Sequence, residues 1–147
     1  MRILIDADGC PVVDLTVKIA CEQGLACLIF CDTSHYFRKE GAETVAVDQG
    51  NDSVDLALVN SIEPGDIVIT QDYGLAAMAL ARRGQVLSQD GLIYDEHNIE
   101  SLLLSRYTAK KIRRGGGRLK GPRKRTVEQD QKFYRSLLSL LKGKKQY

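Results

Sequence analysis

Two short apolar runs that end in carboxylates constrain the fold of this chain more than any other feature. Ile3-Leu4-Ile5 leads into Asp6-Ala7-Asp8, and Ile67-Val68-Ile69 leads into Thr70-Gln71-Asp72. Runs of this length and composition are typical of strands buried on both faces of a parallel sheet. Ligands of such sheets bind at the carboxyl ends of the strands. We therefore expect Asp6, Asp8 and Asp72 to lie together at one edge of a sheet.

The rest of the chain up to Tyr107 continues an alternation of strand and helix patterns. Strands are predicted over residues 2–5, 26–31, 44–47, 66–70 and 85–87. Helices are predicted to begin near Pro11, at Asn51-Asp52-Ser53, at Leu75 and at Asn98. This alternation predicts a three-layer α/β/α domain with a central, mainly parallel sheet over residues 1–107.

The segment after Tyr107 has a different composition and predicts two further elements. Residues 108–125 combine many basic side chains with Gly115-Gly116-Gly117 and Pro122, so we expect a basic, glycine-rich loop. Residues 126–147 begin with a capping-box pair, Thr126 and Gln129, and carry apolar residues at helical spacing. They predict a C-terminal amphipathic helix that packs on the domain or on a partner.

The net charge of +2 hides a strong asymmetry along the chain. Residues 1–105 hold 6 basic and 17 acidic side chains, whereas residues 106–147 hold 15 basic and 2 acidic ones. A basic segment attached to an acidic domain indicates binding to a polyanion, and basic side chains bind phosphates by releasing counterions. The candidate nucleic-acid-binding residues are Lys110, Lys111, Arg113, Arg114, Arg118, Lys120, Arg123, Lys124 and Arg125. The alternative is that this segment neutralises the domain's own acids.

The clustered carboxylates predict a divalent cation, because neighbouring negative charges repel one another unless a cation lies between them. A third apolar run, Val45-Ala46-Val47-Asp48, precedes Asp52 and Asp55, which would share one face of a helix. Oxygen ligands of this kind suit Mg²⁺ or Mn²⁺. Asp52 also has an ordinary explanation as a helix cap, and Asp48 as a turn residue.

The composition further predicts a soluble, cytoplasmic protein. The chain contains no apolar run of about 18 residues and no signal-peptide pattern. Its four cysteines, Cys10, Cys21, Cys27 and Cys31, lack the spacing of a zinc site, so we expect reduced thiols. Cys27 and Cys31 lie in an apolar run, which favours burial over metal binding. No feature of the sequence sets the oligomeric state.

Four longer motifs resemble the YaiI/YqxD family of bacterial proteins over nearly the whole chain. They are residues 5–12 (IDADGCPV), 50–56 (GNDSVDL), 65–76 (GDIVITQDYGLA) and 113–118 (RRGGGR), the last followed by Gly121-Pro122. More distantly the chain resembles PIN-like nuclease domains, which carry an aspartate after the first strand, an acid on a central helix and Thr-x-Asp after the fourth strand. That resemblance implies a PIN-like fold in which Asp6, Asp55 and Asp72 are catalytic, metal-binding acids, with Asp8 and Asp52 as neighbouring ligands.

These observations lead to one functional expectation and two alternatives. The expectation is a nuclease that hydrolyses phosphodiester bonds in RNA or another nucleic acid with Mg²⁺ or Mn²⁺. The first alternative is a nucleic-acid-binding adaptor of the same fold without catalysis. The second takes Asp6-Ala7-Asp8-Gly9 as the nucleophile motif of a haloacid-dehalogenase-like phosphatase, which it resembles except that Cys10 replaces a threonine.

Overall fold

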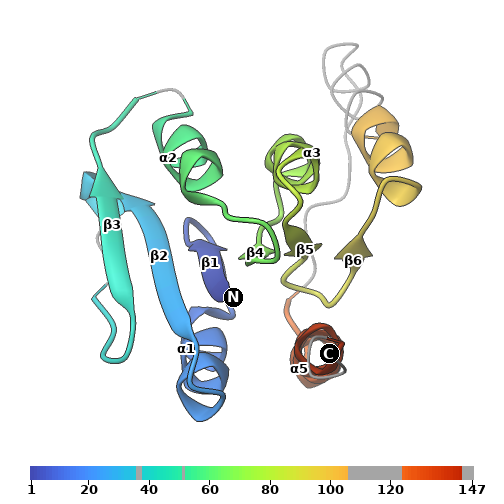
Figure 1. The fold of residues 1–147 in the computed structure, drawn as a ribbon, viewed down its shortest axis with the longest axis horizontal. Helices are drawn as coiled ribbons and strands as arrows, with labels where there is room; N and C mark the ends of the chain where they lie inside the picture. The colour runs from blue at the N-terminus through green and yellow to red at the C-terminus, as the bar shows by residue number, and fades with distance from the viewer. Residues whose placement is uncertain (36–37, 51, 106–123, 144–147) are drawn as a thin grey trace.

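A six-stranded sheet forms the centre of the computed structural model, which describes residues 1–35, 38–50, 52–105 and 124–143 (Figure 1). The strand order is β3-β2-β1-β4-β5-β6, with β1 to β5 parallel and β6 antiparallel to β5. The strands are β1 (Arg2–Asp6), β2 (Ala26–Asp32), β3 (Glu43–Val47), β4 (Ile67–Ile69), β5 (Gln85–Leu87) and β6 (Ile93–Tyr94). The sequence pattern does not predict β6, because a run of two residues is too short to show strand periodicity.

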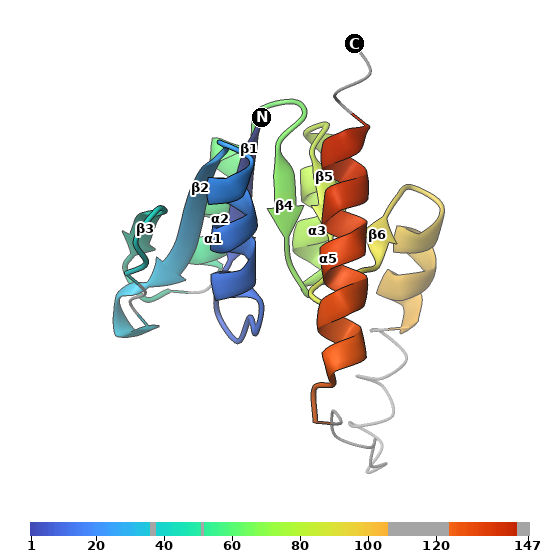
Figure 2. The same ribbon diagram turned by 90° about the horizontal axis from the view of Figure 1, so that it is seen from below.

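Helices cover both faces of the sheet, which confirms the three-layer α/β arrangement. Figures 1 and 2 show α1 (Val13–Glu22) and α5 (Val127–Lys142) on one face. The other face carries α2 (Ser53–Ser61), α3 (Tyr73–Ala81) and a further helix at residues 98–105. Within the described residues, no helix is both long and apolar enough to cross a membrane.

One core cluster lies on each face of the sheet, and successive residues of each central strand belong to the two clusters in turn. Ile3 and Ile5 of β1 pack in the cluster under α1 and α5, whereas Leu4 packs in the cluster under α2 and α3. Strand β4 repeats this, with Ile67 and Ile69 on the first face and Val68 on the second. The period of two is that of successive side chains in a strand. By the same alternation, the residues that follow Ile5 and Ile69 start on the α2/α3 face.

The C-terminal helix α5 belongs to the first of these clusters. Its side chains Phe133, Leu137 and Leu141 are buried there together with β-strand residues. The capping box predicted at its start is confirmed, because Thr126 and Gln129 make both reciprocal hydrogen bonds. Helix α5 therefore covers part of the sheet that α1 leaves uncovered (Figure 2).

Candidate active site

A pocket of about 630 Å³ opens at the carboxyl ends of the central strands, where β1 and β4 lie side by side. The chain leaves β1 for β2 on one side of it, and later returns through α2 to β4 on the other side. Such a reversal of strand order creates a crevice between the connecting segments, which is where open α/β sheets bind ligands. Six carboxylates line this pocket: Asp6, Asp8, Asp32, Asp52, Asp55 and Asp72.

Strand register places Asp6 next to Thr70. Ile5 of β1 is aligned with Ile69 of β4, so the following residues of the two strands meet on the α2/α3 face. The Thr70 hydroxyl donates a hydrogen bond of 2.8 Å to Oδ2 of Asp6 and accepts one of 3.0 Å from the Asp72 backbone N–H. Thr70 is buried. It therefore links the carboxylate that follows β1 to the backbone that carries the carboxylate that follows β4.

The environment of Asp6 disfavours its ionised form. Burial raises the pKa of Asp6 above its ordinary value, and the negative charges of Asp72 and Asp8 raise it further, while the Thr70 hydrogen bond lowers it. The net result is a raised pKa, as expected for a carboxylate that is partly desolvated beside other carboxylates. The charges of Asp72 and Asp8 therefore act on the Asp6 carboxyl group.

Asp72 combines a place in the pocket with a structural task. It is the N-cap of α3, and its Oδ1 accepts hydrogen bonds from the backbone N–H groups of Gly74 and Leu75, at 2.8 and 3.2 Å. These bonds satisfy donors at the helix start and fix the orientation of the carboxylate. The pattern of the sequence predicted the position of Asp72 but not its capping role.

Asp52 and Asp55 enter the pocket from the start of α2. Asp52 occupies the N-cap position of α2, as predicted, but its side chain makes no capping hydrogen bond. Its backbone is left-handed, with φ of 61°, a conformation that aspartate tolerates better than most residues. Asp52 and Asp55 both line the cavity, which agrees with their predicted common face.

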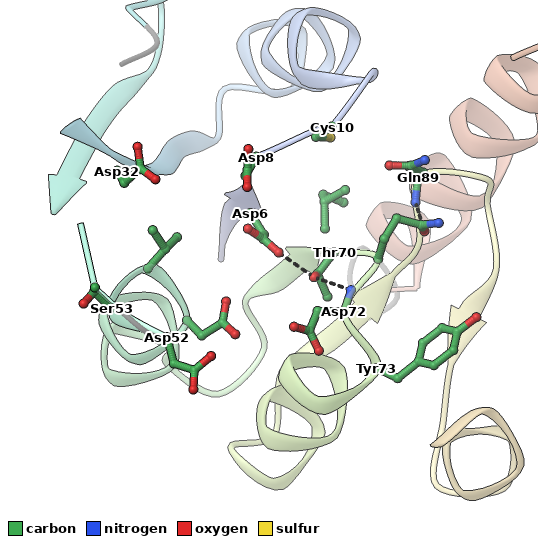
Figure 3. A pocket seen from close by; sticks show the side chains of 15 residues that line it. Asp6, Asp8, Cys10, Asp32, Asp52, Ser53, Thr70, Asp72, Tyr73 and Gln89 are labelled. Atoms are coloured by element: carbon green, nitrogen blue, oxygen red, sulfur yellow. Dashed lines mark hydrogen bonds between the residues drawn. The ribbon is translucent and has the colours of Figure 1, made fainter. Parts of the chain in front are cut away.

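Asp8, Cys10 and Asp32 complete the upper rim of the pocket as drawn in Figure 3. Asp32 was not among the predicted site residues; its Oδ1 accepts hydrogen bonds from the backbone N–H and the hydroxyl of Ser34, which caps the loop after β2. Burial raises the pKa of the Cys10 thiol to about 11, which disfavours the thiolate and makes Cys10 a poor nucleophile at neutral pH. Cys27 and Cys31 are buried free thiols, as predicted.

Three uncharged residues that sequence reasoning missed line the side of the pocket toward β5. They are Gln71, Tyr73 and Gln89. Gln71 and Tyr73 flank Asp72, so their proximity to the site could have been inferred from the chain. Gln89 follows β5, and only the pairing of β5 with β4 brings it to the pocket.

The predicted nucleic-acid-binding segment lies mostly outside the described residues, which include only Lys124 and Arg125 of its nine basic candidates. Lys124 is exposed. Arg125 forms ion pairs of 2.7 Å with both Asp90 and Asp130, and its Nη2 donates to the Gln89 carbonyl at 2.6 Å. Arg125 therefore ties the start of α5 to the loop that bears Gln89.

The predicted metal ligands line one cavity but do not form a closed coordination cage. Within the described part of the chain, no three His, Cys, Asp or Glu side chains are grouped so that they could hold one ion. Asp6 and Asp72 lie near each other in the middle of the pocket, whereas Asp52 lies on the α2 side (Figure 3). The arrangement therefore offers oxygen donors from separate elements around a common space.

Comparison with known proteins agrees with this motif set. Residues 4–143 match the family described as "Uncharacterized BCR, YaiI/YqxD family". A UPF0178 protein of Exiguobacterium sibiricum is 52% identical over 144 residues, covering 98% of this chain and 99% of the relative. UPF0178 proteins of Ruminiclostridium cellulolyticum and Clostridium kluyveri are 46% and 43% identical, covering 97% and 100% of this chain and 93% and 97% of the relatives. No solved structure matches the chain. On this evidence the chain belongs to the YaiI/YqxD family.

Proposed function

We propose that this pocket hydrolyses phosphodiester bonds in nucleic acid, RNA above all, with a divalent cation held by its carboxylates. One observation carries the proposal: six carboxylates from separate strand and helix ends line a single cavity at the point where the strand order reverses. Asp72 and Asp32 accept hydrogen bonds from local backbone. Asp6 instead accepts its hydrogen bond from the Thr70 hydroxyl, and Asp52 makes no side-chain capping bond. Placing so many negative charges together is costly unless the site binds cations.

The donor set fits Mg²⁺ or Mn²⁺ in the way that substrate-bridging sites bind these ions. Mg²⁺ typically takes one or two protein carboxylates and keeps several waters for a phosphate substrate, so a full cage of protein ligands is not needed. Asp6 and Asp72 would hold the cation, with Asp8, Asp52 and Asp55 binding its waters or a second ion. Burial raises the pKa of Asp6 and the charges of Asp72 and Asp8 raise it further, as expected for a carboxylate in such a site before a cation is bound.

The two carboxylates in the middle of the pocket are oriented by neighbouring groups. Thr70 orients the Asp6 carboxylate through its hydroxyl, and the backbone N–H groups of Gly74 and Leu75 orient Asp72. When bound, the cation supplies an acidified water as nucleophile and neutralises the charge that develops on the phosphate. No protein general base is needed for this chemistry, which suits a site whose described lining contains no histidine.

Binding of a polyanion to such an acidic pocket requires positive charge from elsewhere. Among the described residues, those that line the pocket include no lysine or arginine. A bound cation supplies part of the missing charge. We propose that the basic residues between 110 and 125 supply the rest, since phosphate contacts of Lys and Arg account for most non-specific affinity for nucleic acid.

The test is cleavage of fluorescent single-stranded RNA and DNA in the presence of Mn²⁺ or Mg²⁺. Asp6→Asn and Asp72→Asn should each lower the rate at least about 100-fold, since each removes a charge that the reaction needs. Asparagine keeps the capping ability of Asp72 and the acceptor for Thr70, so both variants should stay folded. Asp14→Asn, an exposed acid on α1 outside the pocket, should cleave at the wild-type rate.

Two results would contradict the proposal. If RNA binds but is cleaved under no metal, the protein is a binding or adaptor protein. If Asp6 is instead captured as a covalent aspartyl-phosphate analogue, the pocket is that of a phosphatase.

A further inference from the structure

We propose that Tyr73, Gln71 and Gln89 form a binding site for one unpaired nucleobase beside the carboxylates. The inference rests on the proposed function, because it specifies the substrate of the same pocket as single-stranded nucleic acid. All three residues line the cavity that contains Asp6 and Asp72. None of them carries a charge, so this part of the lining is chemically distinct from the acidic part.

The two parts occupy opposite sides of the pocket. In Figure 3, Asp52 lies on the α2 side and Asp32 at the end of β2, with Asp6, Asp8 and Asp72 in the middle. Tyr73 and Gln89 lie on the other side, toward β5 and β6. The cavity volume of about 630 Å³ is in the range of pockets that enclose a small ligand. A nucleotide can therefore place its phosphate among the carboxylates and its base on the uncharged side.

The Tyr73 ring is positioned by packing against the core under α2 and α3. It packs edge to face against Tyr94, with the ring centroids 6.1 Å apart and the planes at 69°. Tyr94 is buried, and its hydroxyl donates to the Thr70 carbonyl at 3.3 Å. Thr70 is the residue that also contacts Asp6. A preorganised aromatic ring at this place can stack on a base with little loss of conformational freedom.

The two glutamines add amide groups to this side of the pocket, and hydrogen bonds hold the Gln71 side chain and the Gln89 backbone in place. Oε1 of Gln71 accepts a hydrogen bond of 3.1 Å from the Gln89 backbone N–H, which identifies the oxygen end of the amide. The NH₂ group of Gln71 is therefore a donor for a base carbonyl or ring nitrogen. The Gln89 carbonyl is held in turn by Arg125. Amide side chains of this kind pair with the edges of unstacked bases.

These features favour a single strand over a duplex. A base that is paired within a helix cannot reach a ring inside a pocket unless it is first unstacked and unpaired, which costs free energy. Single-stranded RNA presents its bases without that cost, and aromatic stacking is the usual way in which proteins bind such bases.

The experiment compares two ligands and four proteins by fluorescence anisotropy, with Ca²⁺ as the cation to keep cleavage slow. The ligands are fluorescein-labelled hexaadenylate and the same hexamer with abasic residues. Tyr73→Leu should bind hexaadenylate about ten-fold more weakly than wild type, the size expected for one lost stacking contact. Tyr73→Phe should bind as wild type does. Tyr134→Leu, which removes an exposed aromatic on α5, should also leave binding unchanged.

The abasic hexamer separates base recognition from other effects. Wild type should bind it about as weakly as Tyr73→Leu binds hexaadenylate, and Tyr73→Leu should cause no further loss with it, because the two changes remove the same contact. Equal losses by Tyr73→Leu with both ligands, or no loss with hexaadenylate, would overturn the inference. The readout is binding, so it is independent of cleavage. If Tyr73→Leu shows no base-dependent loss of binding while cleavage still depends on Asp6, only the base site is refuted and the nuclease proposal stands. A base effect without Mn²⁺-dependent cleavage supports the base site and refutes the nuclease.

Discussion

Burial, neighbouring charges and one hydrogen bond all affect the pKa of Asp6. Burial and the charges of Asp72 and Asp8 favour its protonated form, whereas the Thr70 hydroxyl favours the ionised form. The raised pKa means that, between the unfolded and folded pKa values, the folded protein binds more protons than the unfolded chain. Stability must therefore fall as pH rises through that window and remain lower above it.

Replacing Asp6 with asparagine should consequently stabilise the protein at neutral pH in the presence of EDTA. We expect a gain of about 0.5–2 kcal/mol in the free energy of unfolding, because the substitution removes a negative charge that is partly buried beside other carboxylates. The gain should disappear below the unfolded pKa of aspartate, about 3.9, where both states are protonated. Urea titrations from pH 3.5 to 8 measure this, with Asp14→Asn as the control. A loss of stability at pH 7 would show that the carboxylate is structural.

The residues of the site differ in how far the sequence could predict them. Asp6, Asp8 and Asp72 could be placed at one sheet edge, because each follows an apolar run of strand length. The contact of Thr70 with Asp6 could not, since it depends on the register between β1 and β4, which is set by packing of the whole sheet. The sequence places Asp52 at the start of α2, but it does not tell whether the side chain caps the helix, which depends on the side-chain conformation.

At the scale of elements, α5 is fitted closely to the rest of the structure. Gly91, in the turn between β5 and β6, has φ of +89°, and a Cβ atom there would lie 2.8 Å from the backbone of Lys132. The Ser136 hydroxyl donates to the Gly91 carbonyl at 2.6 Å. These contacts hold the middle of α5 against the turn that also carries Gln89. Arg125, just before α5, adds a hydrogen bond to the Gln89 carbonyl, so the helix and the residues that precede it support the uncharged side of the pocket.

Truncation of Phe133 tests how much stability α5 contributes. Phe133 is fully buried, at 0% exposure, so Phe133→Ala should lower the free energy of unfolding by about 3–5 kcal/mol through lost burial and a cavity. Its neighbour Tyr134 is 41% exposed, and Tyr134→Ala should cost about 1 kcal/mol or less. Chemical denaturation of the full chain measures both. Similar small losses in the two variants would contradict the packing of α5 on the sheet.

The order of strands and helices is the part of the fold that the sequence predicts best. Apolar runs such as 2–5 and 26–31 agree with β1 and β2 to within a residue at each end. Strand β6 escaped prediction because Ile93 and Tyr94 pair with β5 through a tight turn rather than through a long apolar pattern. The face of the sheet that each helix covers follows from crossover handedness and packing, which periodicity alone does not specify.

The whole molecule combines an acidic pocket with a basic segment of the same chain. The described domain carries the carboxylates at one end of the sheet, and the strongest positive charge of the sequence lies between residues 110 and 125. Opposite charges on neighbouring segments suit a protein that must bring a polyanion to a cation-dependent site. Arg125 marks where the basic segment joins the described domain.

Calorimetric titration of Mn²⁺ tests the central claim most directly, because it asks whether the carboxylates bind a cation without assuming a substrate. Wild type and Asp14→Asn should show saturable binding of equal affinity. Asp6→Asn and Asp72→Asn should bind at least about ten-fold more weakly, since the loss of a direct ligand exceeds typical losses from outer residues. Unchanged affinity in both variants, or no saturable binding by wild type, would contradict a cation site in this pocket.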